Sequence, residues 1–226
     1  NGSIHKNSIV KRENTFYFFD AYNSKIIKHS QAGKDEPSEN YGMHDSFTIL
    51  TPHYVNNNYH LNDDRRYIVT AIFDKRNNDY IITFDTDEDT PIGTPPPEIV
   101  KFTVAYNEKE NAFIGFYSFT PKFYASINNR VLSASHSPLL GHKIYLHNSY
   151  KSKHGMYYDT MYNTEIIFIA NPNPTLSKYF DNQKIHLNEK DTFRLNNIIW
   201  RTDENGQQSA RLTTPPNIIE HRWFKR

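Results

Sequence analysis

Apolar and aromatic residues occur along the chain in short runs that are separated by polar residues. In TFYFFDAYNSKIIKHS, residues 15–30, an aromatic run ends at Asp20, small and polar residues follow, and an apolar run restarts at Ile26 and Ile27. Asp and Asn suit such a reversal because their short side chains bond to local backbone groups and because they tolerate positive φ. The pattern therefore predicts a β-hairpin in this segment.

The same order of aromatic run, polar turn and apolar run occurs in three more segments, residues 67–85, 99–119 and 155–171. The hexapeptide YNSKII of the first hairpin, residues 22–27, returns as YNTEII in the last, residues 162–167. We interpret the two hexapeptides as equivalent parts of repeated units. The residues expected in the four hairpin turns are Asp20 and Asn23, Asp74 and Asn77, Asn107 and Asn111, and Asp159 and Asn163.

The spacing of these hairpins predicts larger units. Residues 67–118 are expected to form a four-stranded antiparallel meander, and a similar unit follows, with short strands around Asn128 and Asn129, the strand KIYLHN and the YNTEII hairpin. Repeated four-stranded sheets of roughly 50 residues are typical of propeller blades. Apolar residues on both faces of residues 67–73 favour a sheet packed between neighbours.

The predicted fold class is therefore all-β, with antiparallel four-stranded sheets as blades of an incomplete β-propeller. Missing blades would come from sequence or chains outside this segment; alternatively, the sheets are stacked and never form a ring. The ending FKR predicts a processing site or a fragment boundary. The expected parts are a partial blade with a late hairpin at 1–30, a loop-rich insertion at 31–62, a blade at 63–118, a blade at 119–170, and a C-terminal extension at 171–226 that continues into further sequence or a partner chain.

The expected insertion is polar and rich in Asn, with one helical turn predicted near residues 41–47. Long insertions at the edges of blades often carry contacts. Aromatic side chains outside the predicted strands are the better candidates for contact with a partner, and those of the insertion are Tyr41, Phe47, Tyr54 and Tyr59.

Composition supports the β prediction and excludes several functions. Aromatic residues make up 15% of the chain while hydrophobic residues make up only 37%, a balance that suits half-buried strands. The net charge of +1 provides no field that would hold DNA tightly. With no cysteine, the chain has neither disulfides nor a thiolate nucleophile. No apolar run is long enough to predict a membrane segment.

Two clusters raise the question of a metal site. Asp85, Asp87 and Asp89 have the alternate carboxylates of a calcium loop, but Thr90 and Pro96 stand where an EF-hand has glycine and glutamate. A solvated loop is the preferred interpretation. The histidines of the second cluster fit no compact ligand spacing, so no metal or other cofactor is predicted; they are His136, His142, His147 and His154.

Candidate catalytic carboxylates are equally weak. Asp63 and Asp64 precede Arg65 and Arg66, which indicates salt bridges at the entry to a strand. Glu108 and Glu110 fall in a predicted turn and are expected to point to solvent. Because no nucleophile elbow, P-loop or metalloprotease motif is present, the chain is predicted not to be an enzyme.

The succession of segments resembles a known protein family. FYFFDAYNSKIIKHSQAG, DDRRYIVTAIFDKRNNDYIITFD, VAYNEKENAFIGFYSFTPKFYASINNRVLS, IYLHN and YNTEIIFIANPNPTLSKYFDN are similar, in this order, to tail structural proteins of crAss-like and related Bacteroidota-infecting podoviruses, called stabilisation, nozzle or muzzle proteins. The resemblance extends from about Asn14 to Arg226 and carries no catalytic motif.

The resemblance implies a virion structural protein of a short-tailed phage, assembled in the cytoplasm of the bacterial host. Its expected place is the tail nozzle or muzzle around the DNA exit channel, with assembly and host-contact roles. Its expected partners are other tail proteins, copies of itself in a ring about the tail axis, and the remainder of a longer or cleaved polypeptide. DNA would pass nearby without tight binding. Two other functions stay open: a carbohydrate-binding or depolymerising tail-fibre module, and a propeller scaffold for protein interaction.

Overall fold

A computed structural model describes residues 3–55, 67–86, 101–134, 143–149, 155–163 and 165, together with the backbone of four short strands between residues 182 and 222. The chain divides into two compact units, Asn1–Glu165 and Ile166–Arg226. The first unit contains every element that is described with its side chains.

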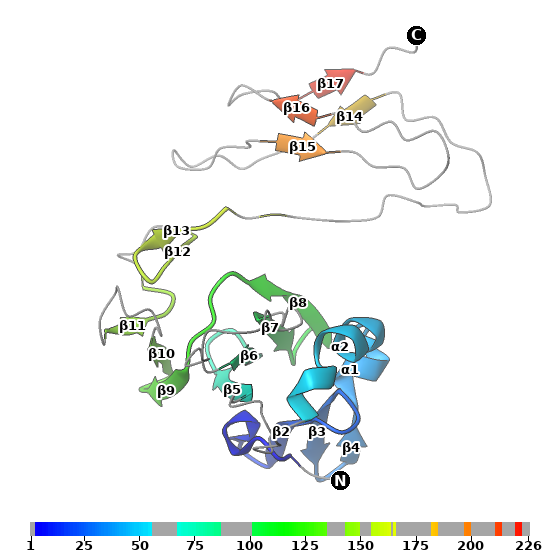
Figure 1. Cartoon of the computed structure of the whole chain (residues 1–226), viewed down its shortest axis with the longest axis vertical. Coiled ribbons are helices and arrows are strands. Elements are labelled where there is room, and N and C mark those ends of the chain that lie inside the picture. The colour runs from blue at the N-terminus through cyan, green and yellow to red at the C-terminus, as the bar shows by residue number, and fades with distance from the viewer. Residues whose placement is uncertain are drawn as a thin grey trace, which may run out of the picture. The chain divides into compact units, whose positions relative to one another are not determined.

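The first sheet is a meander of four antiparallel strands in chain order, preceded by the 3-10 turn η1 at Lys6–Ser8 (Figure 1). Its strands are β1 (Val10–Arg12), β2 (Thr15–Asp20), β3 (Lys25–Ser30) and β4 (Gly33–Asp35). The sequence predicted only the hairpin of β2 and β3 and assigned residues 33–35 to an insertion. This part of the prediction was wrong because β1 and β4 have three residues each, too few for an alternating pattern to be recognised.

The segment predicted as an insertion continues into α1 (Pro37–Asn40), α2 (His44–Leu50) and the 3-10 turn η2 (Pro52–Val55). The hydroxyl of Ser38 accepts a hydrogen bond from the backbone N–H of Ile26 at 3.0 Å and so holds α1 against β3. Phe47 is 1% exposed and Tyr54 is fully buried, so the expectation that they contact a partner was wrong. Tyr41 is partly buried and packs against the hydrophobic core that contains Phe47 and Tyr54. Tyr59 lies outside the described residues.

The second sheet confirms the four-stranded meander that the sequence predicted at residues 67–118. Its strands pair antiparallel in chain order: β5 (Tyr67–Asp74), β6 (Asp79–Thr86), β7 (Phe102–Asn107) and β8 (Ala112–Tyr117). Successive side chains of a strand point to opposite faces, and both faces of this sheet are covered. Val69 and Phe73 of β5 pack toward the first sheet, whereas Ile72 packs toward the third.

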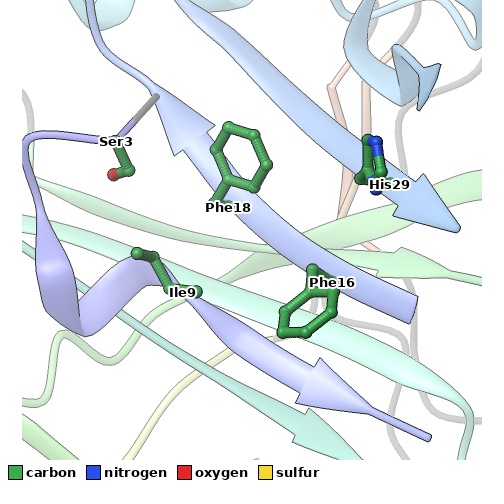
Figure 2. Close-up of a pocket in the computed structure, with 5 residues that line it drawn as sticks. All are labelled: Ser3, Ile9, Phe16, Phe18 and His29. Atoms are coloured by element: carbon green, nitrogen blue, oxygen red, sulfur yellow. The ribbon is translucent and has the colours of Figure 1, made fainter. Parts of the chain in front are cut away.

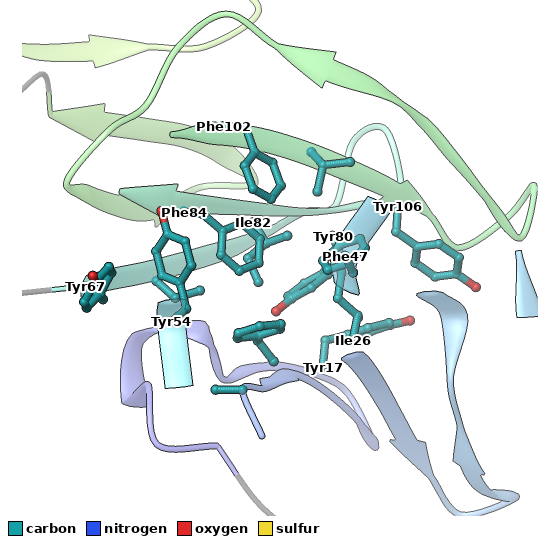
Figure 3. Packing of buried hydrophobic residues seen from close by; sticks show 14 of the residues in the cluster. Tyr17, Ile26, Phe47, Tyr54, Tyr67, Tyr80, Ile82, Phe84, Phe102 and Tyr106 are labelled. Atoms are coloured by element: carbon teal, nitrogen blue, oxygen red, sulfur yellow. The ribbon is translucent and has the colours of Figure 1, made fainter. Parts of the chain in front are cut away.

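An aromatic core lies between the first and second sheets (Figure 3). Phe84 stacks on Phe102 with ring centroids 4.6 Å apart and meets Phe19 of β2 edge to face at 4.9 Å. Tyr17 of β2 stacks on Tyr80 at 5.1 Å. Offset stacks and edge-to-face contacts are the geometries that aromatic quadrupoles favour. The aromatic excess of the composition is thus used mainly for packing between sheets.

The third sheet has three strands, β9 (Phe123–Ile127), β10 (Arg130–Ala134) and β11 (Ile144–Leu146), in the order β11-β10-β9. Its inner face packs on the second sheet through a smaller core that includes Tyr124, Val131 and the linking Phe119. The sequence predicted a fourth strand in this unit. The structure instead pairs β12 (Met156–Tyr157) and β13 (Thr160–Met161) as a separate two-stranded hairpin.

The two hexapeptides are therefore not equivalent. Residues 22–24 of YNSKII lie in the turn between β2 and β3, whereas Tyr162 and Asn163 of YNTEII follow β13. The hairpin of β12 and β13 reverses at Tyr158 and Asp159, before YNTEII begins. Both residues adopt positive φ, 51° and 62°, and this makes a two-residue turn sufficient.

The second unit contributes two antiparallel strand pairs. β14 (Asn182–Lys184) pairs with β17 (Glu220–Arg222), and β15 (Asn197–Ile199) pairs with β16 (Arg211–Thr213). Across the described residues the fold is mostly antiparallel β-structure with few helices, and none of the described sheets closes on itself. The fold class is thus β as expected, while the propeller remains a prediction. None of the described helices has the length and apolar character that are needed to cross a membrane.

The role of α2 in the core can be tested with two substitutions on one helix. Phe47→Ala should lower the free energy of unfolding by about 3–5 kcal/mol, because it leaves a cavity among Phe19, Phe84 and Phe102. Ile49→Ala is the matched control: its side chain is 73% exposed, so a change within about 0.5 kcal/mol is expected. Urea denaturation followed by circular dichroism measures both, and equal losses would contradict the packing of Phe47.

Candidate functional site

Three of the predicted hairpin turns share one local geometry. In each turn a residue at position i accepts a hydrogen bond from position i+3, and the residue at i+4 has positive φ. Asn23 Nδ2 donates to Asp20 Oδ2 at 2.8 Å, and Asn77 Nδ2 donates to Asp74 Oδ2, also at 2.8 Å. In the third turn the backbone N–H of residue 110 donates to Asn107 Oδ1 at 2.8 Å. The residues with positive φ are Ser24, Asn78 and Asn111.

The turns of the second sheet are bonded to each other. The amide of Asn107 donates to the carboxylate of Asp79 at 2.7 Å and to the carbonyl oxygen of Asn77 at 2.9 Å. Burial raises the pKa of Asp79, the hydrogen bond from Asn107 opposes this shift, and the charge of Asp74 adds to it. These contacts fix one end of the sheet.

Glu108 connects this end to the first sheet. Its carboxylate pairs with Arg12 of β1 and lies 3.2 Å from Lys28 Nζ of β3. Arg12 also donates to Asn78 Oδ1 at 3.0 Å and lies 4.5 Å from the ring centroid of Phe73. The expectation that Glu108 points to solvent was wrong, because tertiary packing brings two cations from the first sheet to this turn.

Asp85 is the one carboxylate of the acidic loop that lies within the described residues. It is buried and pairs with Lys122 at 3.0 Å and Lys101 at 3.3 Å. Two ammonium groups already balance its charge, so its carboxylate is used in the fold. Asp87, Asp89 and the cluster of residues 63–66 lie outside the described residues.

Of the clustered histidines, only His147 is described. Its Nε2 lies 2.5 Å from the hydroxyl of Ser133, which lies 2.6 Å from that of Tyr158. Burial among aromatic rings, including Phe119 at 5.0 Å, lowers the pKa of His147 to about 4. Its position is that of a residue packed against the third sheet and the neighbouring aromatic rings. No group of three or more potential metal ligands forms among the described residues.

The outer face of the third sheet is apolar and exposed. Side chains directly opposite each other on antiparallel strands share a face, and Phe123, Ala134 and Ile144 are aligned in this way. Phe123 is 58% exposed and Ile144 is 72% exposed. The same face carries Ala125, Ile127, Leu132 and Leu146. The sequence pattern did not predict this surface, because apolar residues are common on both faces of a strand and the pattern does not show which face stays exposed.

The outer face of the first sheet carries an apolar hollow of about 290 Å³ (Figure 2). Phe16 and Phe18 of β2 form its floor together with Ile9, which is 47% exposed, and Ser3 and His29 complete its lining. Ligand pockets usually measure about 300–1,000 Å³, so this hollow is small and suits a single side chain better than a cofactor. The hollow and the outer face of the third sheet are the candidate functional surfaces of the first unit.

Two known protein families together match almost the whole chain. The Crassvirus muzzle protein family matches residues 1–137, and the family of the Crassvirus muzzle protein C-terminal domain matches residues 152–224. No curated protein matches the chain.

The pairing of Glu108 with the first sheet can be tested by removing its charge. Glu108→Gln should lower the free energy of unfolding by about 1–3 kcal/mol, because Arg12 and Lys28 lose a partly buried carboxylate. The loss should shrink as salt concentration rises. Glu110→Gln, whose side chain is 66% exposed, is the control and should have little effect. Thermal melts at low and high salt distinguish the two, and a salt-independent loss would count against the ion pairs.

The burial of His147 has a consequence for acid stability. The unfolded chain protonates this histidine near pH 6.5 and the folded chain only near pH 4, so stability falls as pH is lowered through this interval. The free energy of unfolding lost to this protonation is at most about 3.5 kcal/mol, at about 1.4 kcal/mol for each pKa unit. In His147→Gln the unfolding free energy should depend less on pH between 6.5 and 4, and a slope identical to that of the unaltered chain would refute the assignment.

Proposed function

The chain belongs to the Crassvirus muzzle protein family, and from this premise we propose that it forms part of the tail nozzle around the channel through which DNA leaves the virion. Membership of the family gives the chain a structural role in the virion tail, in association with other virion proteins. The observation that carries the proposal is the pair of family matches, at residues 1–137 and 152–224.

The chemistry of the described residues supports a structural role. Three ionisable groups that could have been catalytic or metal-binding are engaged in the fold: Glu108 joins two sheets, Asp85 pairs with two lysines, and His147 is packed between rings, whereas Glu110 is exposed. A nozzle wall needs rigid packing more than a reaction centre. The net charge of +1 suits a passage that DNA crosses without being held.

We propose further that the three sheets are consecutive blades of a propeller that this segment alone does not complete. In a propeller the innermost strands of neighbouring blades converge on the axis. Here β5, the first strand of its sheet, contacts both β1 and β9, which are the first strands of theirs. The remaining blades would come from other copies in a ring about the tail axis, from other tail proteins, or from the remainder of a longer or cleaved polypeptide. Assembly would take place in the host cytoplasm, and host contact would be a secondary role.

Immunogold electron microscopy of intact virions tests the proposed position. An antibody raised against the purified chain should place gold on the tail, along its axis and below the capsid. The same antibody pre-adsorbed with the chain is the control and should leave the particles unlabelled. Label on peripheral fibres would overturn the nozzle assignment in favour of a carbohydrate-binding module, and particles without label would overturn a virion role.

A further inference from the structure

The boundary between the two family matches differs from the boundary between the two compact units. The matches end at residue 137 and resume at residue 152, whereas the units divide between Glu165 and Ile166. Residues 152–165 are therefore matched by the family of the C-terminal domain, yet they belong to the first unit. The described part of this segment includes the hairpin of β12 and β13 with its flanking residues, here called the 155–163 hairpin.

Two aromatic side chains attach the 155–163 hairpin to the rest of the first unit. The ring of Tyr158 meets that of Tyr145 in β11 edge to face at 4.8 Å, and its hydroxyl lies 2.6 Å from that of Ser133 in β10. Tyr158 is only 8% exposed as a result. The ring centroid of Tyr157 lies 4.6 Å from that of Phe119. Phe119, Ser133 and Tyr145 all precede residue 152, so the hairpin packs on a part of the chain that the C-terminal domain family does not match.

These aromatic contacts contribute more to the position of the hairpin than its own strand pairing does. β12 and β13 have two residues each, and an isolated two-stranded hairpin is at best marginally stable in water. Asp159 accepts hydrogen bonds from the hydroxyl of Tyr145 at 2.9 Å and from Lys143 Nζ at 3.2 Å. Its side chain is 56% exposed, however, and exposed ion pairs contribute little. The buried rings therefore hold the hairpin, and Asp159 adds direction to the contact.

We propose that the 155–163 hairpin is a docking element that attaches the C-terminal domain to the first unit by packing, in addition to the covalent chain. The receiving surface is formed by Phe119, Ser133 and Tyr145, and its partner is the aromatic hairpin of the same chain. Unit 2 begins at Ile166, a few residues after β13 ends, so the hairpin tethers the remainder of the C-terminal domain closely. A break in the chain between the two family matches would leave this attachment intact.

Gly155 closes the base of the hairpin and provides a way to disturb it. Its φ is +74°, and its carbonyl oxygen accepts a hydrogen bond from the backbone N–H of Tyr162 at 2.8 Å. A Cβ atom at this position would lie 2.8 Å from the carbonyl oxygen of Tyr162, which is too close for a relaxed contact. Gly155→Ala therefore strains the hairpin through both the close contact and the positive φ, yet it removes no side chain from the receiving surface.

Cleavage of the folded chain tests the proposal. A recognition site for a sequence-specific protease is inserted after Lys151 of the full chain, directly before the C-terminal match begins. After complete cleavage the two pieces should elute together in size-exclusion chromatography. Gly155→Ala and Tyr158→Ala should each raise the dissociation constant of the two pieces about tenfold or more, measured by diluting the cleaved protein. Met161→Ala is the matched control, because its side chain lies on the same hairpin and is 53% exposed, so the pieces should stay together as before.

Two results would overturn the inference. In the first, the two pieces of the chain with an unaltered hairpin separate on cleavage. In the second, the pieces of Gly155→Ala and Tyr158→Ala stay together as tightly as those of Met161→Ala, because contacts other than the hairpin would then hold them. Circular dichroism melts before cleavage show which variants are folded, and if Tyr158→Ala is not, Gly155→Ala decides alone, since it keeps every side chain of the core. The position of gold label on virions is independent of all these outcomes.

Discussion

Burial of both faces of the second sheet is the interaction on which the rest of the described fold depends. β5, β6 and β7 place one set of side chains toward the first sheet and the alternate set toward the third, so neither neighbour would have a core without them. Each large side chain that is fully buried contributes about 1.5–3 kcal/mol, and favourable ring geometries add about 0.5–1.5 kcal/mol for each pair. The large aromatic content of this chain is therefore a consequence of packing sheet on sheet.

Polar contacts then determine how the sheets are aligned. Apolar burial has no preferred direction, and a sheet could slide on its neighbour at little cost to buried area. The turn containing Glu108 prevents this movement, because its carboxylate needs both Arg12 and Lys28 of the first sheet, while Asn107 holds the same turn to the adjacent one. Between the second and third sheets, the hydroxyl of Tyr124 in β9 lies 2.7 Å from that of Thr83 in β6 and adds a similar directional contact. These contacts favour a single, well-defined stack.

A stack of this kind explains why a tail protein of the Crassvirus muzzle family can be structural and still carry many ionisable groups. Among its described buried carboxylates, Asp85 is paired with two lysines, and the other three accept hydrogen bonds from asparagine side chains. The outer faces of the first and third sheets carry apolar side chains, as do the interfaces inside the stack. In a protein built of stacked sheets, the outer face of each terminal sheet stays exposed unless another molecule covers it. In an assembly, neighbouring proteins can cover these faces.

The sequence by itself determined the local structure. Asp20, Asp74 and Asn107 mark the three turns, because a side chain that accepts the bond from position i+3 defines the reversal within a few residues, and the length of the apolar runs was enough to predict the meander of β5 to β8. Only the tertiary structure decided the rest. The short strands β1 and β4 exist because longer neighbours offer them hydrogen-bonding edges. Phe47 and Tyr54 are core residues and Glu108 is an ion-pair partner because segments distant in sequence surround them. A local sequence pattern indicates which residues can form turns or pair in strands. It does not indicate which distant segments will pack against those residues in the folded chain.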